Sequence, residues 1–463
     1  MTPWTPALRT GDSPLYVRIA DAIERDIKAG ALLAGSRLPP HRDLAHRLSI
    51  GIGTVTKAYS EAERRGLLTG QVGRGSYVAE IGRRQGARAM ADEPLDLARN
   101  LPPITSGDRH LAETLAKFRR RPDLAAILGY GPPEGDETVR AAGAQWLIER
   151  HGLSRVSVEE LLPCNGGQHA LLLVLGAICR PGDAVLCEAS TFFGLKTLAD
   201  FVGYRLVGVE MDGDGIVPDA LERAASSSGA RVLYTVPTLH NPTTTTTGEW
   251  RRRELASVAE RLDLLIVEDD AYRVLVDRRE APTTYADLAP DRTAYVATLS
   301  KGMLPGLRLG FVKVPDQAMR DGVIRSIRAT NYSLPSLGGL IFAEWVEEGI
   351  AQRISDEVVA EAAARTDLAR SILGSALGPI GGAQSLHVWM PLSPLEAERT
   401  AARALRAGVD LTPPDALAIG ASAPSGLRIC LGGAPDLDGL ATGLSLIARA
   451  MSSELAGQSR ALL

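Results

Sequence analysis

The spacing of apolar residues predicts two kinds of architecture along this chain. Apolar side chains recur at helical spacing over residues 14–30, and two further helices are predicted, one from near Pro40 and one over 52–66. A glycine-rich turn between two short extended runs predicts a hairpin over 67–78. Three helices followed by a hairpin predict a winged helix-turn-helix domain over residues 12–80.

Beyond a linker predicted for residues 81–95, short apolar runs alternate with helical stretches. The predicted strands are 161–164, 184–187, 205–209, 231–236, 263–267, 294–299 and 309–314, followed by 385–390 and 427–431. This alternation predicts an α/β large domain over residues 96–345, with a largely parallel sheet between two layers of helices. Longer helical patterns accompany the last two strands and predict a smaller α+β domain over residues 346–463.

Composition narrows the class of protein. The chain has 463 residues, 45% of them hydrophobic and 23% charged, which is typical of globular proteins. Its four cysteines form no CxxC pair and no cluster with metal-ligand spacing, so we expect reduced thiols and no metal site. There is no signal-peptide pattern and no apolar run of membrane-spanning length, so we expect a cytoplasmic protein without membrane contact.

Charge is unevenly distributed. Residues 1–85 contain 13 Lys and Arg against 8 Asp and Glu, whereas the rest of the chain is acidic. A basic N-terminal part on an acidic body indicates that only this part approaches a polyanion.

The fragments LPPHRDLA, GTVTKAY, RRGLL and GRGSYV, in this order, resemble GntR-type winged-helix domains over residues 14–79. The resemblance implies double-stranded DNA as a partner; the alternative is that this domain only mediates protein contacts. The residues expected at DNA are Arg37, Arg42, Thr54, Thr56, Lys57 and the wing tip Gly73, Arg74 and Gly75. Ile52 stands where many members carry arginine, which leaves the base preference open.

Polar residues follow the ends of several predicted strands, where open α/β sheets form their binding crevice. Gly167 opens a helix whose free amides can bind phosphate. Asp269 and Tyr272 are three residues apart and can face one ring, although an acidic helix cap is an alternative. Lys301 can form a Schiff base. Phe192 can stack on a ring or lie in an ordinary core, and Asn241 can simply be a turn residue before proline.

SKGMLPGLRLG, VEDDAY and HNPT together resemble fold-type I, class I/II aminotransferases, which use pyridoxal 5'-phosphate (PLP), over residues 96–440. The resemblance implies Lys301 as the aldimine lysine, Asp269 at the pyridine nitrogen, and Tyr272 with Asn241 at the ring hydroxyl. Phe192, commonly tyrosine in the family, would stack on the ring. The phosphate would be bound by Gly167, Gln168, Ser300 and Arg308. The common NPTG reads NPTT here, which suggests a reshaped loop.

The same resemblance implies roles for two further residues. Arg428 matches an arginine that binds a substrate carboxylate, together with Asn241. Tyr130 matches a tyrosine that reaches the phosphate in the partner subunit, which implies a homodimer.

The combination of the two domains in this order resembles the MocR-like subgroup of GntR-type regulators. It implies a PLP-dependent transcription regulator that senses an amino acid, or another amine bearing a carboxylate, through formation of an external aldimine. Two alternatives stay open: an active aminotransferase (transaminase) with an accessory DNA-binding domain, and a large domain that serves only as a dimerising scaffold.

Overall fold

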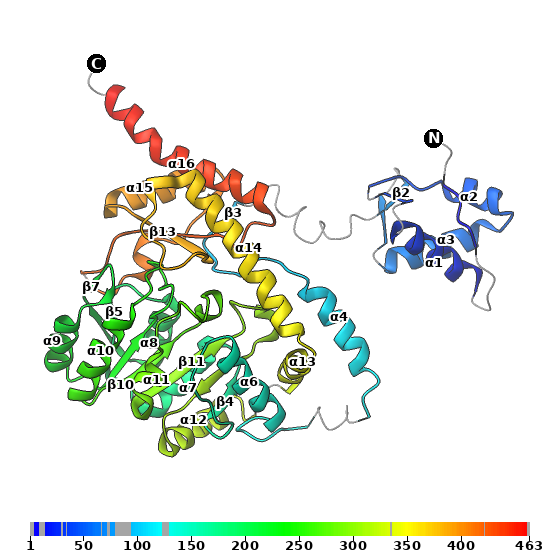
Figure 1. Ribbon diagram of the computed structural model, residues 1–463. Helices are drawn as coiled ribbons and strands as arrows, with labels where there is room; N and C mark the ends of the chain where they lie inside the picture. The colour runs from blue at the N-terminus through cyan, green and yellow to red at the C-terminus, as the bar shows by residue number, and fades with distance from the viewer. Residues whose placement is uncertain are drawn as a thin grey trace. The chain divides into compact units, whose positions relative to one another are not determined.

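A computed structural model describes residues 4–8, 14–28, 31–33, 35–65, 67–71, 75–78, 94–122, 129–333, 336–420 and 422–460. The chain divides into two compact units, Met1–Glu93 and Pro94–Leu463 (Figure 1). Within the described ranges, no helix combines the length and the apolar character needed to cross a bilayer.

The first unit contains three helices and a two-stranded hairpin. Its elements are α1 (Leu15–Lys28), α2 (His41–Leu48), α3 (Ile52–Arg64), β1 (Leu68–Gln71) and β2 (Gly75–Val78). β1 and β2 pair antiparallel, with Leu68 opposite Val78. Ile19, Leu44 and Val55, one from each helix, are fully buried in a common core. The predicted winged helix-turn-helix is confirmed, and α3 is the helix in the recognition position.

A seven-stranded sheet forms the centre of the second unit, in the order β4-β12-β11-β10-β9-β5-β6. The strands are β4 (Leu161–Cys164), β5 (Ala184–Glu188), β6 (Arg205–Val209), β9 (Val232–Thr235), β10 (Leu265–Asp269), β11 (Thr293–Thr298) and β12 (Gly310–Lys313). β12 pairs antiparallel with both neighbours, and the other pairs are parallel. The predicted largely parallel sheet is therefore confirmed, with one reversed strand. Every residue of β4, β5, β9 and β11 is buried, because helices cover both faces of the sheet.

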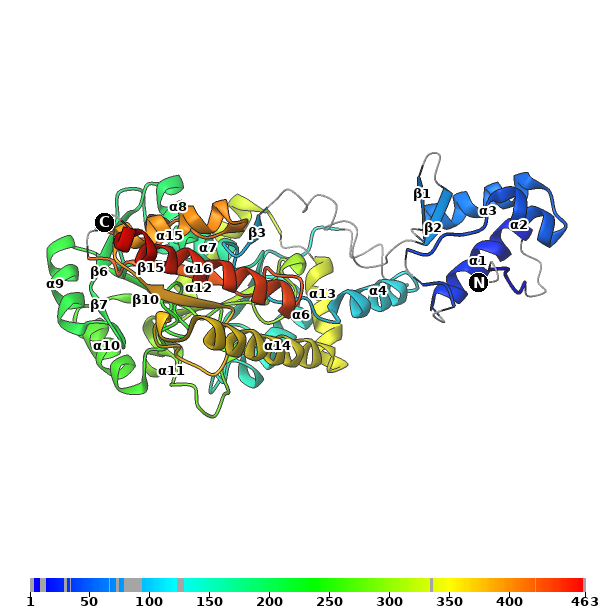
Figure 2. The same cartoon turned by 90° about the horizontal axis from the view of Figure 1, so that it is seen from above.

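The helices of the second unit are α4 (Gly107–Phe118), α6 (Glu137–Glu149), α7 (Gly167–Ile178), α8 (Phe193–Val202), α9 (Pro218–Ser228), α10 (Glu249–Arg261), α11 (Tyr285–Leu288), α12 (Gln317–Thr330), α13 (Ser336–Glu347), α14 (Ile350–Leu373), α15 (Pro394–Arg406) and α16 (Leu437–Arg460). A short hairpin joins β7 (Met211–Asp212) and β8 (Gly215–Ile216). The long helices α14 and α16 pack side by side (Figure 2). Both helices contribute to the core of the smaller domain. In this domain β13 (His387–Pro391) and β15 (Gly426–Cys430) pair antiparallel.

The residues at the start of the second unit pack with its C-terminal part. β3 (Leu95–Asp96) pairs parallel with β14 (Val409–Asp410), and Leu97 is buried in the same cluster as Val388 and Leu427. The predicted boundaries place residue 95 in the linker and residues 96 and 97 in the large domain. The structure instead places Leu97 in the core of the smaller domain, with Leu95 packed against that core. Two-residue strands carry too little periodicity to reveal such a distant partner. Most of the predicted linker lies outside the described residues.

Candidate functional site

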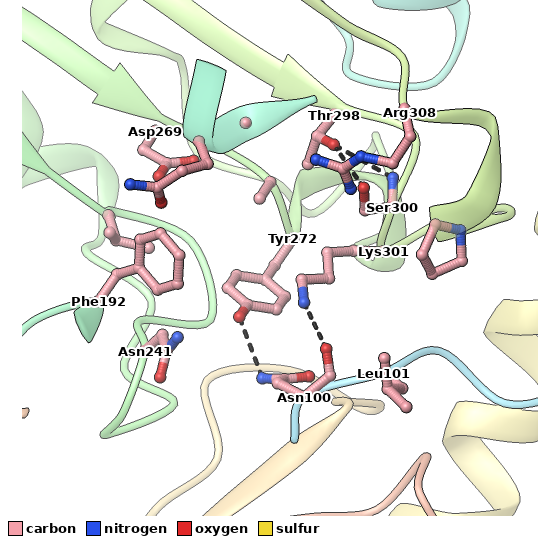
Figure 3. A pocket seen from close by; sticks show the side chains of 15 residues that line it. Asn100, Leu101, Phe192, Asn241, Asp269, Tyr272, Thr298, Ser300, Lys301 and Arg308 are labelled. Carbon is pink, nitrogen blue, oxygen red and sulfur yellow. Dashed lines mark hydrogen bonds between the residues drawn. The ribbon is translucent and has the colours of Figure 1, made fainter. Parts of the chain in front are cut away.

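A cavity of about 250 Å³ lies where β9, β10 and β11 end, as the crevice rule for open α/β sheets predicts. It is lined by Asn100, Leu101, Gly167, Gln168, Phe192, Val236, Asn241, Asp269, Ala271, Tyr272, Thr298, Ser300, Lys301, Pro305 and Arg308 (Figure 3). Nine of the residues predicted for the cofactor are therefore brought to one space, although their side chains come from five separate segments of the chain.

Asp269, the last residue of β10, is buried at the cavity. Its Oδ2 accepts a hydrogen bond of 2.8 Å from the Tyr234 hydroxyl, and its Oδ1 has no hydrogen-bond partner among the described residues. Burial raises the pKa of this carboxyl to about 6, while the Tyr234 hydrogen bond acts in the opposite direction. A carboxylate with one free, buried oxygen can hold a proton on a partner nitrogen.

Lys301 follows β11 and points into the same space (Figure 3). Its Nζ donates to the main-chain oxygen of Asn100 and lies 5.9 Å from the centroid of the Tyr272 ring. Desolvation lowers the pKa of Lys301 to about 8, aided by the positive charge of Arg428 and opposed by Asp269. A larger fraction of this amine is therefore uncharged near neutral pH than for an exposed lysine, which favours nucleophilic chemistry.

One end of the cavity offers donors suited to an anion. Gly166 has a φ of +82° and precedes the first turn of α7, whose amides face the cavity at Gly167 and Gln168. A Cβ at Gly166 would come within 3.0 Å of Arg308 Nη2, so only glycine lets this guanidinium approach the helix start. Ser300 lies beside Arg308, with its hydroxyl 3.0 Å from Thr298 Oγ1 (Figure 3).

Phe192 lines the wall where a ring could stack. Gly194 follows closely, and a side chain at that position would collide with Phe192 and with the Gln168 amide. Gln168 Nε2 donates to the Gly194 carbonyl at 2.8 Å. The tight packing around Gly194 fixes the orientation of the Phe192 ring.

Arg428, on β15, is buried behind the cavity wall. Its Nη1 donates to Asn241 Oδ1 at 2.9 Å, while Nη2 donates to the Ala98 carbonyl at 2.7 Å and to Thr412 Oγ1 at 2.8 Å. Arg428 Nε has no hydrogen-bond partner in the described part of the chain. The guanidinium is thus oriented beside Asn241, where a carboxylate could replace the Ala98 oxygen as acceptor.

Tyr130 is not at the cavity of its own chain. Its side chain is 84% exposed, and its ring packs against exposed Tyr332 with centroids 5.1 Å apart. The predicted role of Tyr130 at a partner's phosphate remains a prediction.

Asn100 and His387 are two residues at the site that the sequence did not predict. Asn100 Nδ2 lies 3.0 Å from the Tyr272 hydroxyl and 3.0 Å from His387 Nδ1. No motif in the sequence marks either residue, because their partners lie 172 and 287 positions away.

The residues predicted at DNA lie in the first unit. Arg37, Arg42, Thr56 and Lys57 are exposed, while Thr54 is half-buried. His41 Nδ1 lies 3.2 Å from Thr56 Oγ1 and thereby joins α2 to α3. Gly75 opens β2, whereas Gly73 and Arg74 lie outside the described residues. Ile52 is 49% exposed at the start of α3.

Each of the two units matches a known protein family. Residues 92–444 match the aminotransferase class I and II family, and residues 15–78 match the bacterial regulatory proteins of the gntR family. The Bacillus subtilis HTH-type transcriptional regulator YdeF is 32% identical over 317 residues, which is 68% of each chain. The probable rhizopine catabolism regulatory protein MocR of Rhizobium meliloti is 26% identical over 375 residues, 74% of this chain and 73% of that one. The chain belongs to the MocR-like, GntR-type regulators.

The aminotransferase part of this MocR-like regulator also has close structural counterparts. The α-aminoadipate aminotransferase of Thermus thermophilus, solved with N-(5'-phosphopyridoxyl)-L-leucine, superposes with a TM-score of 0.70 and 27% identity. The match covers 81% of this chain and 97% of that enzyme. The MocR-like regulator therefore combines a complete fold-type I aminotransferase fold with a GntR-type DNA-binding domain.

Proposed function

We propose that this regulator binds PLP in the cavity and changes its DNA binding when an amino acid, or another amine bearing a carboxylate, reaches Lys301. The observation that carries the proposal is the arrangement of three groups around one space: the amine of Lys301, the free Oδ1 of Asp269, and the Arg308 guanidinium beside the start of α7. An unpartnered buried carboxylate oxygen is costly unless a ligand satisfies it, so this site fits a ligand with a protonated ring nitrogen.

Each part of the cofactor would contact a different set of lining residues. Asp269 Oδ1 would hold the proton on the pyridine nitrogen, and Phe192 would cover the ring. Tyr272 and Asn241 would bind the ring hydroxyl. The phosphate would be bound by Ser300, Arg308 and the amides of Gly167 and Gln168.

When bound, PLP supplies an aldehyde carbon open to attack by amines and a ring that withdraws electrons from that carbon. The chain's own contribution is the amine of Lys301, whose lowered pKa of about 8 keeps it available as nucleophile and proton acceptor. Asp269 would keep the proton of PLP on the ring nitrogen.

The carboxylate of the effector would bind Arg428. In this structure Arg428 Nη2 donates to the Ala98 carbonyl, and Lys301 Nζ donates to the Asn100 carbonyl. Ala98 and Asn100 belong to the first described stretch after residue 93, where the DNA-binding unit ends. Binding of PLP at Lys301 would release the Asn100 carbonyl, and an effector carboxylate at Arg428 would release the Ala98 carbonyl. Occupancy of the site would therefore change the contacts of the segment that leads to the DNA-binding unit.

Two further parts of the proposal concern assembly. The exposure of Tyr130 supports a homodimer in which this side chain reaches the phosphate of the partner's cofactor. Two DNA-binding units per dimer would then engage two half-sites.

A second function, full transamination, is supported by the presence of Lys301, Asp269 and Arg428 in one site.

The test of both functions measures two quantities on the PLP-loaded full chain: binding to the DNA upstream of its own coding sequence at physiological salt, and turnover of an amino-acid panel with 2-oxo acids. We expect specific DNA binding that an amino acid shifts, with little sustained turnover. The Lys301→Ala variant should bind DNA without responding to the amino acid. Rapid multiple turnover without an effect on DNA binding would favour the enzyme instead.

A further inference from the structure

Three side chains form a continuous hydrogen-bonded chain, in which Asn100 and Tyr272 line the cavity and His387 is not one of the lining residues. His387 lies on β13, Asn100 follows β3, and Tyr272 follows β10. The His387 and Tyr272 rings also pack against each other, with centroids 5.3 Å apart. Figure 3 shows the Asn100 amide beside the Tyr272 hydroxyl and the Asn100 carbonyl beside Lys301.

The direction of these hydrogen bonds follows from one carbonyl group. His387 Nε2 lies 3.2 Å from the main-chain oxygen of His240, which can only accept a hydrogen bond. Nε2 must therefore carry a proton. Burial lowers the pKa of His387 to about 3, with the Arg428 charge acting in the same direction, so the ring is neutral. A neutral ring protonated at Nε2 has an acceptor at Nδ1.

This tautomer determines the orientation of Asn100. Since His387 Nδ1 accepts, the Asn100 atom at 3.0 Å must be the donor Nδ2, and the same Nδ2 donates its second hydrogen to the Tyr272 oxygen. An inverted amide would place two acceptors, Asn100 Oδ1 and His387 Nδ1, against each other. The Tyr272 oxygen thus accepts from Asn100, and its own proton is free to point into the cavity.

We propose that His387 and Asn100 are positioning residues that keep the Tyr272 hydroxyl a donor toward the ring oxygen of the cofactor. Asn100 is the cavity-lining member, and His387 acts through it. The inference rests on the proposed binding of PLP at Lys301. Within the described residues, the titratable or charged groups that act on Tyr272 and His387 are Lys301, Asp269, Arg428, His240 and Cys430.

The proposed role has a spectroscopic consequence. A donor at the ring oxygen stabilises its anionic form and so lowers the pH at which the chromophore formed with Lys301 loses its proton. If the Tyr272 proton turns away, that pH rises. A purely structural role of His387 would change the melting temperature without moving this titration.

The test is a pH titration of the visible absorbance of the PLP-loaded full chain. We expect His387→Phe, which keeps an aromatic ring beside Tyr272, and Asn100→Ala each to raise the midpoint by about one pH unit. Because the two residues act in series, the double variant should show the same shift as each single variant. His387→Asn offers an acceptor near the position of Nδ1 and should restore the wild-type midpoint.

The matched control is His151→Phe. His151 is also fully buried with a pKa lowered to about 3, and its Nδ1 lies 2.8 Å from the Tyr295 hydroxyl, away from the residues that line the cavity. This control should lose stability without a shift in the midpoint. Melting curves of all variants identify those that remain folded at the temperature of the titration, and Asn100→Ala serves if His387→Phe does not fold.

The outcomes separate the inference from the proposed function. A wild-type protein that stays colourless with PLP would overturn both. A coloured wild type with folded variants whose midpoint is unchanged, or with additive shifts in the double variant, would overturn the inference and leave the cofactor in place.

Discussion

Tyr234 and Asp269 share a hydrogen bond beneath the cavity: the phenol donates to Oδ2 at 2.8 Å, and within the described chain Oδ1 is left without a partner. Asp269 thus buries one carboxylate oxygen that no group of the described chain satisfies. Such a group costs stability when it is charged, and a ligand that donates to Oδ1 removes part of that cost. The relationship between these two residues therefore couples folding stability to occupancy of the site.

Asp269→Asn should stabilise the cofactor-free protein at pH 7.5. Burial raises the pKa of Asp269 to about 6, so the folded state binds the proton more tightly than the unfolded state, and stability falls as pH rises from about 4 to 6. Above this window the charged carboxylate costs up to about 3 kcal/mol, which asparagine avoids while still accepting from Tyr234. Urea unfolding at pH 7.5 and at pH 4 measures the difference, which should be small at pH 4.

The same substitution should reduce the stabilisation that PLP binding gives to the folded protein. Asparagine cannot hold a proton on the ring nitrogen, so PLP should raise the melting temperature of Asp269→Asn less than that of wild type. A variant that is less stable than wild type at pH 7.5 without cofactor would contradict this interpretation of Asp269.

Arg428→Gln should weaken the binding of carboxylate-bearing amines by about 30- to 100-fold, because hydrogen bonds to a charged group are lost. The measurement is a visible titration of the PLP-loaded protein with an amino acid and with the amine that lacks its carboxylate. Wild type should prefer the amino acid, and the variant should not discriminate. Arg428→Lys should not restore the preference, since an ammonium cannot reproduce the fork that contacts Asn241, Ala98 and Thr412. An unchanged preference in Arg428→Gln would place the carboxylate elsewhere.

Most of the cavity could be predicted from the sequence because its residues stand next to strong local patterns. Gly167 and Lys301 follow buried strands and Asp269 ends one, and a mostly parallel sheet brings the ends of such strands to one edge. The fold followed from the same alternation of strands and helices. The exact boundaries differ by one or two residues, as at β10, which the structure extends to Asp269.

Asn100 and His387 could not be predicted by that argument. Asn100 belongs to an irregular segment, and it reaches the cavity only because Leu95 and Leu97 anchor the preceding residues in the smaller domain. His387 stands in an apolar strand, where a histidine ordinarily indicates a satisfied core residue. Their role depends on contacts between distant segments, which neither periodicity nor motif spacing records.

Lys57→Ala should weaken DNA binding without changing sequence preference. Lys57 is exposed on α3, and a cation that contacts phosphate contributes through the release of counterions. Its removal should reduce the slope of log affinity against log salt by about 1. Fluorescence anisotropy at several salt concentrations measures the slope. Arg279→Ala removes an exposed cation from the second unit and serves as the control, with an unchanged slope expected. An equal decrease of the slope in both variants would mean that DNA affinity depends only on the net charge of the protein.

Tyr130 tests the assembly, because its exposed side chain lies outside the cavity of its own chain. If it reaches the partner's phosphate, Tyr130→Ala should weaken PLP binding, and Lys301→Ala should give no chromophore. Dimers formed from one chain of each kind should regain one site of wild-type affinity, because the intact Lys301 and the intact Tyr130 then meet at the same site. Titration of the co-expressed, purified heterodimer with PLP measures this recovery. Tyr332→Ala, which removes the exposed ring packed against Tyr130 but leaves Tyr130 in place, is the control for loss of local packing and should keep the wild-type affinity for PLP. A heterodimer with no high-affinity site would show that each chain binds its cofactor without Tyr130 of its partner.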